Sequence, residues 1–164
     1  MEKAGEEEVD WFDPSPFIEG SHKLTEVVGF WPSFDDAAVL TLRLDRADGS
    51  PWRPESDSPT LDLTLRLSET GYYLVKIQFK NVENIELSNF SYQNEIMEIV
   101  FDREPDSVDS EGRFWSAKLL VEIQAHCGLQ AKFECKSAAV RSVVPCNKDG
   151  SISGISATLN GKAK

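Results

Sequence analysis

Several residue types and patterns that carry chemistry in other proteins are scarce in this chain or missing from it. The sequence has two histidines and three cysteines, and no two of the cysteines form a C-x-x-C pair. A zinc site with the usual four ligands is therefore not expected. The glycine-rich patterns that cradle phosphates and the G-x-S-x-G pattern around a nucleophilic serine are also missing. We predict no enzyme activity, no catalytic residue, no bound metal and no cofactor.

Long apolar runs are missing as well. No stretch approaches the roughly 20 apolar residues that a membrane-spanning helix needs. The first ten residues are polar and acidic, so they lack the apolar core of a signal peptide. The odd number of cysteines leaves at least one thiol unpaired. Together these features predict a location in the reducing cytoplasm.

Positive charge is also in short supply. The 164 residues include 28 Asp and Glu against 17 Lys and Arg, which gives a formal net charge of −11. Such a field repels nucleic acids and anionic membranes, so neither is a predicted partner. It attracts basic protein surfaces and speeds the encounter with them. The plain alternative is a well-solvated acidic protein, because net charge governs solubility and association rather than fold.

Apolar and polar residues alternate along much of the chain, which is typical of strands with one buried face. The clearest alternation covers 40–44, 61–67, 73–79, 115–123 and 129–135, and weaker strand signals cover 82–87, 96–101 and 140–144. Short polar turns between them favour antiparallel pairing. We predict a mainly β fold, an antiparallel sandwich or a partly closed barrel of about eight strands. One or two short helices should lie near the N-terminus, the clearer over 21–28 with Gly29 at its end.

The composition divides the chain into one domain with two polar ends. Residues 1–10 are predicted to be a flexible acidic N-terminus, and residues 11–146 a single β-rich domain. Residues 147–164 are rich in Ser, Gly and Lys, so they form either a polar tail or an edge strand.

Two groups of carboxylates are candidates for binding. The adjacent Asp35 and Asp36 could hold a divalent cation, but on an extended chain they point to opposite faces unless the backbone turns. We favour one of them bracing the neighbouring aromatic residues while the other is solvated. The second group is the acidic loop over 102–112, which is either solvated or a docking surface for a basic partner. The carboxylates of this loop lack the spacing of a calcium loop; they are Asp102, Glu104, Asp106, Asp109 and Glu111. Trp52, in a separate proline-rich loop, is a further candidate contact.

The stretch from Gly29 to Val39 resembles the opening signature of the immunity protein 50 family of bacterial polymorphic toxin systems. The matching residues are Trp31, Pro32, Ser33, Phe34, Asp36, Ala37 and Val39, whereas Asp35 and Ala38 replace an expected His and Glu. Residues 79–87, with Phe90 and Gln93-Asn94, are similar to the middle of that family. The likeness spans roughly residues 22–135. We expect Trp31, Pro32, Phe34 and Asp36 to serve the structure.

This resemblance implies an immunity protein, a cytoplasmic inhibitor that binds a cognate toxin domain and blocks its active site without catalytic residues of its own. A toxin with a basic active-site cleft would suit an inhibitor of this charge. The alternative is a small-ligand-binding β-barrel protein, which needs an apolar cavity. A homodimer formed through an edge strand is compatible with either hypothesis.

Overall fold

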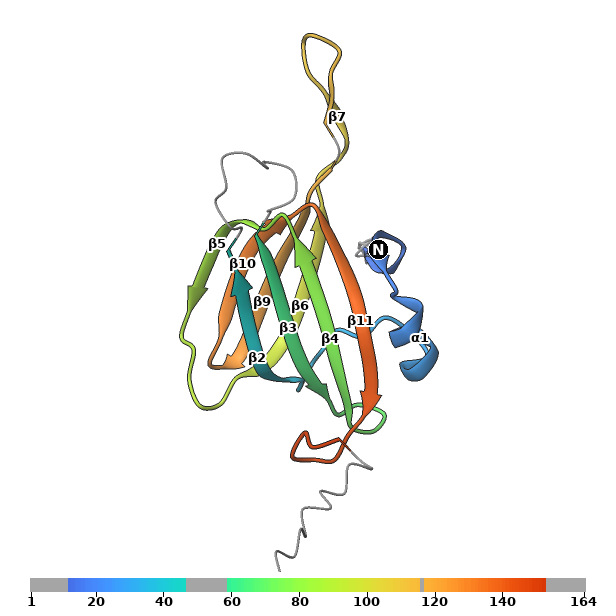
Figure 1. Cartoon of the computed structure of the whole chain (residues 1–164), viewed down its shortest axis with the longest axis vertical. Helices are drawn as coiled ribbons and strands as arrows, with labels where there is room; N and C mark the ends of the chain where they lie inside the picture. Colours follow the sequence, from blue (N-terminus) through green and yellow to red (C-terminus); the bar gives the residue numbers. More distant parts are fainter. Residues whose placement is uncertain (1–11, 47–58, 116, 153–164) are drawn as a thin grey trace, which may run out of the picture.

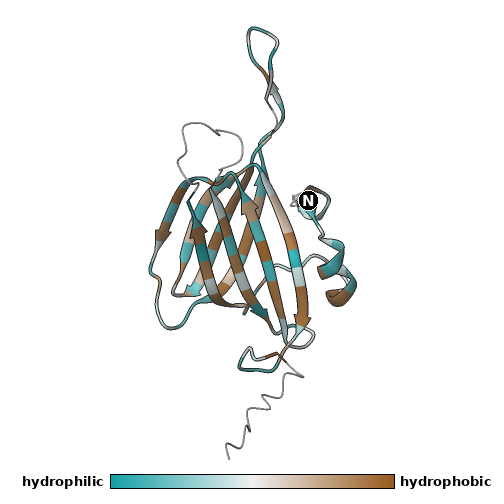
Figure 2. Cartoon of the chain, in the orientation of Figure 1, coloured by the Kyte–Doolittle hydropathy of each residue, from teal (hydrophilic) through white to brown (hydrophobic). Residues whose placement is uncertain are grey.

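The structure is a computed structural model that describes residues 12–46, 59–115 and 117–152, and it confirms the mainly β class (Figure 1). The apolar residues of each alternating segment turn to one side, and brown and teal bands follow one another along the strands in Figure 2. The elements of the described ranges are η1 (Ser15–Phe17), β1 (Ile18–Glu19), α1 (His22–Val28), β2 (Ala38–Asp45), β3 (Thr60–Leu67), β4 (Tyr73–Lys80), β5 (Glu83–Ser88), β6 (Glu95–Arg103), β7 (Ser107–Val108), β8 (Phe114–Trp115), β9 (Leu119–Cys127), β10 (Gln130–Cys135) and β11 (Ser137–Pro145).

Nine of these strands form one sheet in the order β1-β11-β4-β3-β2-β6-β9-β10-β5, and β7 pairs with β8 in a separate hairpin. The sheet is not closed into a barrel. Strands β2 and β6, at its middle, pair in register only at Ala38 and Glu95 and then diverge. This divergence lets the sheet fold over, so that β2, β3, β4 and β11 form one layer and β6, β9, β10 and β5 form the other (Figure 1).

Aromatic rings join the two layers. Phe79 of β4 meets Phe133 of β10 edge to face, with 4.9 Å between ring centroids, and also stacks on Phe101 of β6 at 6.5 Å. All three rings are buried in a core otherwise made mainly of Leu, Ile and Val. Burying large apolar side chains between the layers is the main force that holds them together.

One part of the predicted strand pairing is wrong. The prediction was an antiparallel sheet, but β1 pairs with β11 in parallel, with Ile18 opposite Ala138, so the sheet is mixed. Short polar turns identified the antiparallel neighbours correctly. They carry no information on β1, because β1 and β11 are separated by most of the chain.

The expected short helix is present as α1, over His22–Val28, with Leu24 and Val28 buried. Gly29 follows it in the left-handed conformation, and its amide donates to the carbonyl oxygen of Thr25 at 2.7 Å, which caps the helix end. Across the described residues, no helix combines the length and the apolar character that crossing a bilayer requires.

Gly128, in the turn between β9 and β10, provides a test of the packing. A Cβ at this position would lie 2.1 Å from the carbonyl oxygen of Gln93 and 2.4 Å from Oδ1 of Asn94, and φ is +85°. Gly29 has a similar φ of +93°, but a Cβ there would meet nothing within 4 Å. Gly29→Ala should therefore cost only the backbone strain, about 1–2 kcal/mol. Gly128→Ala should lower the free energy of unfolding further, by roughly 1–3 kcal/mol, because the turn must also move.

Urea denaturation of the two variants beside the parent protein measures this difference. Equal losses at the two glycines would mean that the turn after β9 is not packed against residues 93–94.

Candidate functional site

The segment 29–37 leads from α1 into β2 and lies along the edge of β6. Ser33 accepts a hydrogen bond through its carbonyl oxygen from the amide of Ile99, at 3.0 Å. The Trp31 ring stands edge-on to both Phe34 and Phe101, with centroid distances of 5.6 and 5.7 Å. Pro32 and Phe34 are buried, and Asp36 is exposed. Trp31, Pro32 and Phe34 thus pack the corner where the sheet folds over.

The chain turns sharply just before β2, which brings the carboxylates of Asp35 and Asp36 to the same side. Phe34 and Asp36 have φ values of +70° and +59°, so the segment is not extended and the two side chains need not diverge. The amide of Asp36 donates to the carbonyl oxygen of Ile96 at 3.0 Å, which attaches the turn to β6.

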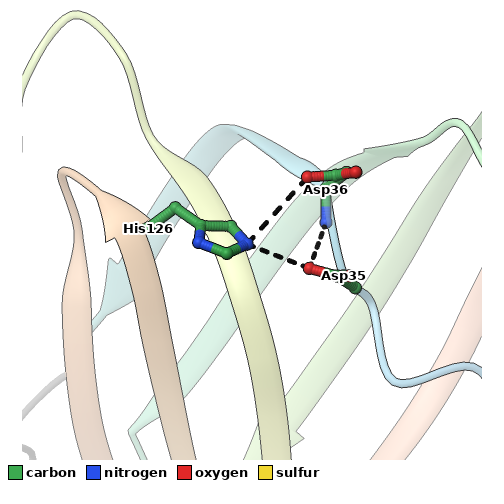
Figure 3. A group of neighbouring side chains, drawn as sticks. All are labelled: Asp35, Asp36 and His126. Carbon is green, nitrogen blue, oxygen red and sulfur yellow. Dashed lines mark hydrogen bonds and ion pairs between the residues drawn. The ribbon is translucent and has the colours of Figure 1, made fainter.

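A histidine from a distant strand completes this cluster (Figure 3). Nε2 of His126, on β9, lies 3.0 Å from Oδ1 of Asp35 and 4.0 Å from Oδ1 of Asp36. All three side chains are exposed, and one ligand atom from each lies within 4.8 Å of the others. Burial raises the pKa of the Glu69 carboxyl group, and the nearby negative charges of Asp35 and Asp36 raise it further. Two carboxylates and one imidazole are a donor set that could hold a divalent metal ion.

A second feature covers the outer face of the layer made by β6, β9, β10 and β5. Strand register aligns Val100, Glu122, Lys132 and Glu86 in one row across the four strands. The next row places Leu120 between Asp102 and Glu134. All seven residues line a depression of about 390 Å³, and Glu86, Glu122 and Lys132 also line an adjoining depression of about 790 Å³; we call the two depressions together the acidic groove. It presents four carboxylates and one ammonium group around half-buried apolar side chains.

One of these carboxylates is partly neutralised from the rim. Nζ of Lys118 lies 3.5 Å from Oε2 of Glu134 and 2.7 Å from Oε2 of Glu83. The hydrogen bond to Glu83 is the main reason that the pKa of Lys118 is raised. Glu86 and Glu122 flank Lys132, which pairs in register with both. The groove therefore keeps an excess of negative charge.

The outer face of the other layer has the opposite balance. A smaller depression over β2, β3, β4 and β11 is lined by Arg43, Lys76 and Arg141 with one carboxylate, Asp62. Arg141 donates to the side-chain oxygen of Gln78, which keeps the guanidinium on this face. Charge of opposite sign is thus segregated onto the two outer faces of the sandwich.

The acidic loop predicted over 102–112 forms the end of β6 and part of the β7–β8 hairpin, which extends away from the sheet (Figure 1). Asp102 lines the acidic groove, and Glu104 is exposed beyond it. The remaining carboxylates pair within the loop: Asp106 with Arg103 at 3.2 Å, and Asp109 and Glu111 with Arg113 at 2.8 and 2.6 Å. Trp52 lies outside the described residues.

Sequence reasoning missed Glu86, Glu122 and Glu134 as candidate contacts. Glu122 and Glu134 each lie between two buried residues, and Glu86 lies between the apolar Ile85 and Leu87 on a predicted strand, so their outward direction could be anticipated. What the alternation does not contain is the strand order, which places β5, β10, β9 and β6 side by side.

The three thiols differ in exposure, and this difference predicts their reactivity. Cys127 is exposed, whereas Cys135 and Cys146 are buried. Burial raises the pKa of Cys135 to about 12 and also raises that of Cys146, so little of either is present as the reactive thiolate at pH 8. We expect Ellman's reagent to label one thiol quickly in the native protein and all three after unfolding. Cys127→Ser should remove the fast phase, and a second fast thiol would contradict this assignment.

Comparison of the chain with protein-family models, with curated proteins and with solved structures finds no match.

Proposed function

We propose that this protein is an immunity protein that binds a cognate bacterial toxin domain through the acidic groove and neutralises it. The observation that carries the proposal is the groove itself, where Glu86, Asp102, Glu122 and Glu134 surround an apolar floor. Protein interfaces combine a desolvated apolar centre with a polar rim, and the groove has both parts.

The floor of the groove supplies the apolar component. Val100 and Leu120 are half-buried on the outer face of the sheet, and Met97 beside them is exposed. A methionine side chain adapts to the shape of a partner at low cost. Contact with these groups would displace water from apolar surface and so provide affinity, while the carboxylates select a basic partner.

The segregated charge supports a preferred direction of approach. The cationic face with Lys76 and Arg141 would repel a basic cleft, and the acidic groove would attract it. A toxin domain that acts on nucleic acid needs positive charge at its active site, so a groove of this sign suits an inhibitor that covers that site.

Two further features support the assignment. The resemblance of residues 29–39 to the immunity protein 50 signature remains a prediction, and it rests on the residues alone. The three free cysteines suit a reducing compartment such as the cytoplasm, where an immunity protein would protect the cell. We propose no catalytic role, and the alternative of a ligand-binding barrel has less support because Phe79 and Phe133 fill the space between the layers.

The experiment is native mass spectrometry of the purified protein mixed with the toxin domain encoded in the neighbouring reading frame. We expect a 1:1 complex at micromolar concentration and loss of toxin activity in the same mixture. Absence of a complex at that concentration would contradict the proposed function.

A further inference from the structure

The corner where β2 meets β6 holds a set of side chains that the proposed function does not use. We propose that Asp35, Asp36 and His126 form a binding site for a divalent transition-metal ion of the zinc class. This inference does not rest on the proposed function, because no partner protein contributes to the site.

The identity of the donors selects the class of ion. Carboxylate oxygens alone would suit calcium or magnesium, which prefer oxygen ligands. The nitrogen of the His126 imidazole changes that preference toward zinc, cobalt or manganese, which accept imidazole and carboxylate together. Three protein donors leave the remaining coordination positions to water.

The separations between the histidine nitrogen and the two aspartate oxygens fit a common ion. Two donors that each lie about 2.1 Å from one ion cannot be more than about 4.2 Å apart. Nε2 of His126 lies 3.0 and 4.0 Å from the two aspartate oxygens, within that limit, whereas the bound that holds for every pair of donors, 4.8 Å, is slightly longer. Because all three side chains are exposed, a small rotation about their side-chain bonds brings them onto the ion (Figure 3).

The backbone holds the donors together without help from the ion. Buried Phe34 anchors the turn on one side, and the hydrogen bond from the Asp36 amide to Ile96 anchors it on the other. His126 comes from β9, on the far side of β6 in the sheet order. The site therefore exists only in the folded protein, so an ion bound there should stabilise the fold.

Local charge favours a cation at the same position. Asp35 and Asp36 place two exposed carboxylates next to each other. A divalent ion would lower the repulsion between them.

The test uses the tag-free full chain with Cys127→Ser, which removes the exposed thiol next to His126 as a competing zinc ligand. Zinc is titrated by calorimetry, and thermal unfolding is followed with and without zinc. We expect saturable 1:1 binding and a melting temperature that rises with zinc concentration. His126→Ala and Asp36→Asn should each weaken zinc binding by about tenfold or more. Replacing even a residue that only hydrogen-bonds to a metal ligand typically lowers metal affinity by about tenfold.

His22 provides the matched control, because it is the only other histidine of the sequence and lies exposed on α1. His22→Ala should leave the affinity for zinc unchanged, and circular dichroism without metal verifies that each variant is folded. The proposal is overturned if zinc does not bind up to millimolar concentration, or if His126→Ala binds zinc as the background protein does. An equal loss in His22→Ala, or displacement of zinc by an equal concentration of calcium, would also overturn it.

Discussion

Replacing Phe133 by alanine is expected to lower the free energy of unfolding by about 3–5 kcal/mol. The ring is 1% exposed and lies 4.9 Å from the ring of Phe79, so it joins β10 to β4 across the two layers. Its removal takes away buried apolar surface and leaves a cavity that the neighbouring strands cannot fully close. Urea denaturation followed by circular dichroism measures the loss.

Phe90 provides the control for this prediction, because it is the same residue type with 64% of its surface exposed. Phe90→Ala should change the free energy of unfolding by less than about 0.5 kcal/mol, as is usual for exposed positions. If Phe133→Ala cost no more than Phe90→Ala, the two layers would not be held together by these rings.

Reversing two charges in the acidic groove should weaken binding of the cognate toxin domain by about 100-fold or more. Breaking charge pairs at the centre of a protein interface typically lowers affinity by this amount. Glu86→Lys combined with Glu122→Lys changes the sign of the groove while Val100 and Leu120 remain in place. Both glutamates are on the solvent side of their strands, and because the two new lysines flank Lys132 in register, circular dichroism first verifies that the variant is folded. Surface plasmon resonance of the immobilised toxin measures the dissociation constant.

The opposite face supplies a control with the same number of reversals. Lys76→Glu combined with Arg141→Glu should leave the dissociation constant within a few-fold of the parent value, because these residues lie over β4 and β11. For the parent protein, the association rate constant should fall as salt is raised, since screening weakens steering between opposite charges. Equal losses in the two double variants would locate the binding surface elsewhere.

Much of the sheet could be predicted because its signal is local. Leu61, Leu63 and Leu65 alternate with polar residues, and all three are buried in β3 as expected. The period of two follows from the geometry of the extended backbone, which sends neighbouring side chains to opposite faces. The end of α1 at Gly29 was equally local, because a glycine accepts the left-handed conformation at little cost.

The candidate metal site could not be predicted for the opposite reason. The sequence shows Asp35 next to Asp36, but nothing near them indicates that His126, 91 residues away, lies 3.0 Å from the first of them. The positive φ values at Phe34 and Asp36 also depend on the burial of Phe34 and on the hydrogen bond to β6. Both conditions come from the packed sheet rather than from the local sequence.

The sequence by itself determined that this chain is acidic, forms mostly strands and buries alternate residues, since charge, propensity and alternation belong to short segments. Only the tertiary structure decided which strands are neighbours. That order gathers Glu86, Glu122 and Asp102 on one face, places Arg43, Lys76 and Arg141 on the other, and brings His126 to the two aspartates. Strand order depends on how large apolar faces pack against one another across the whole chain, and no short stretch of sequence contains that information.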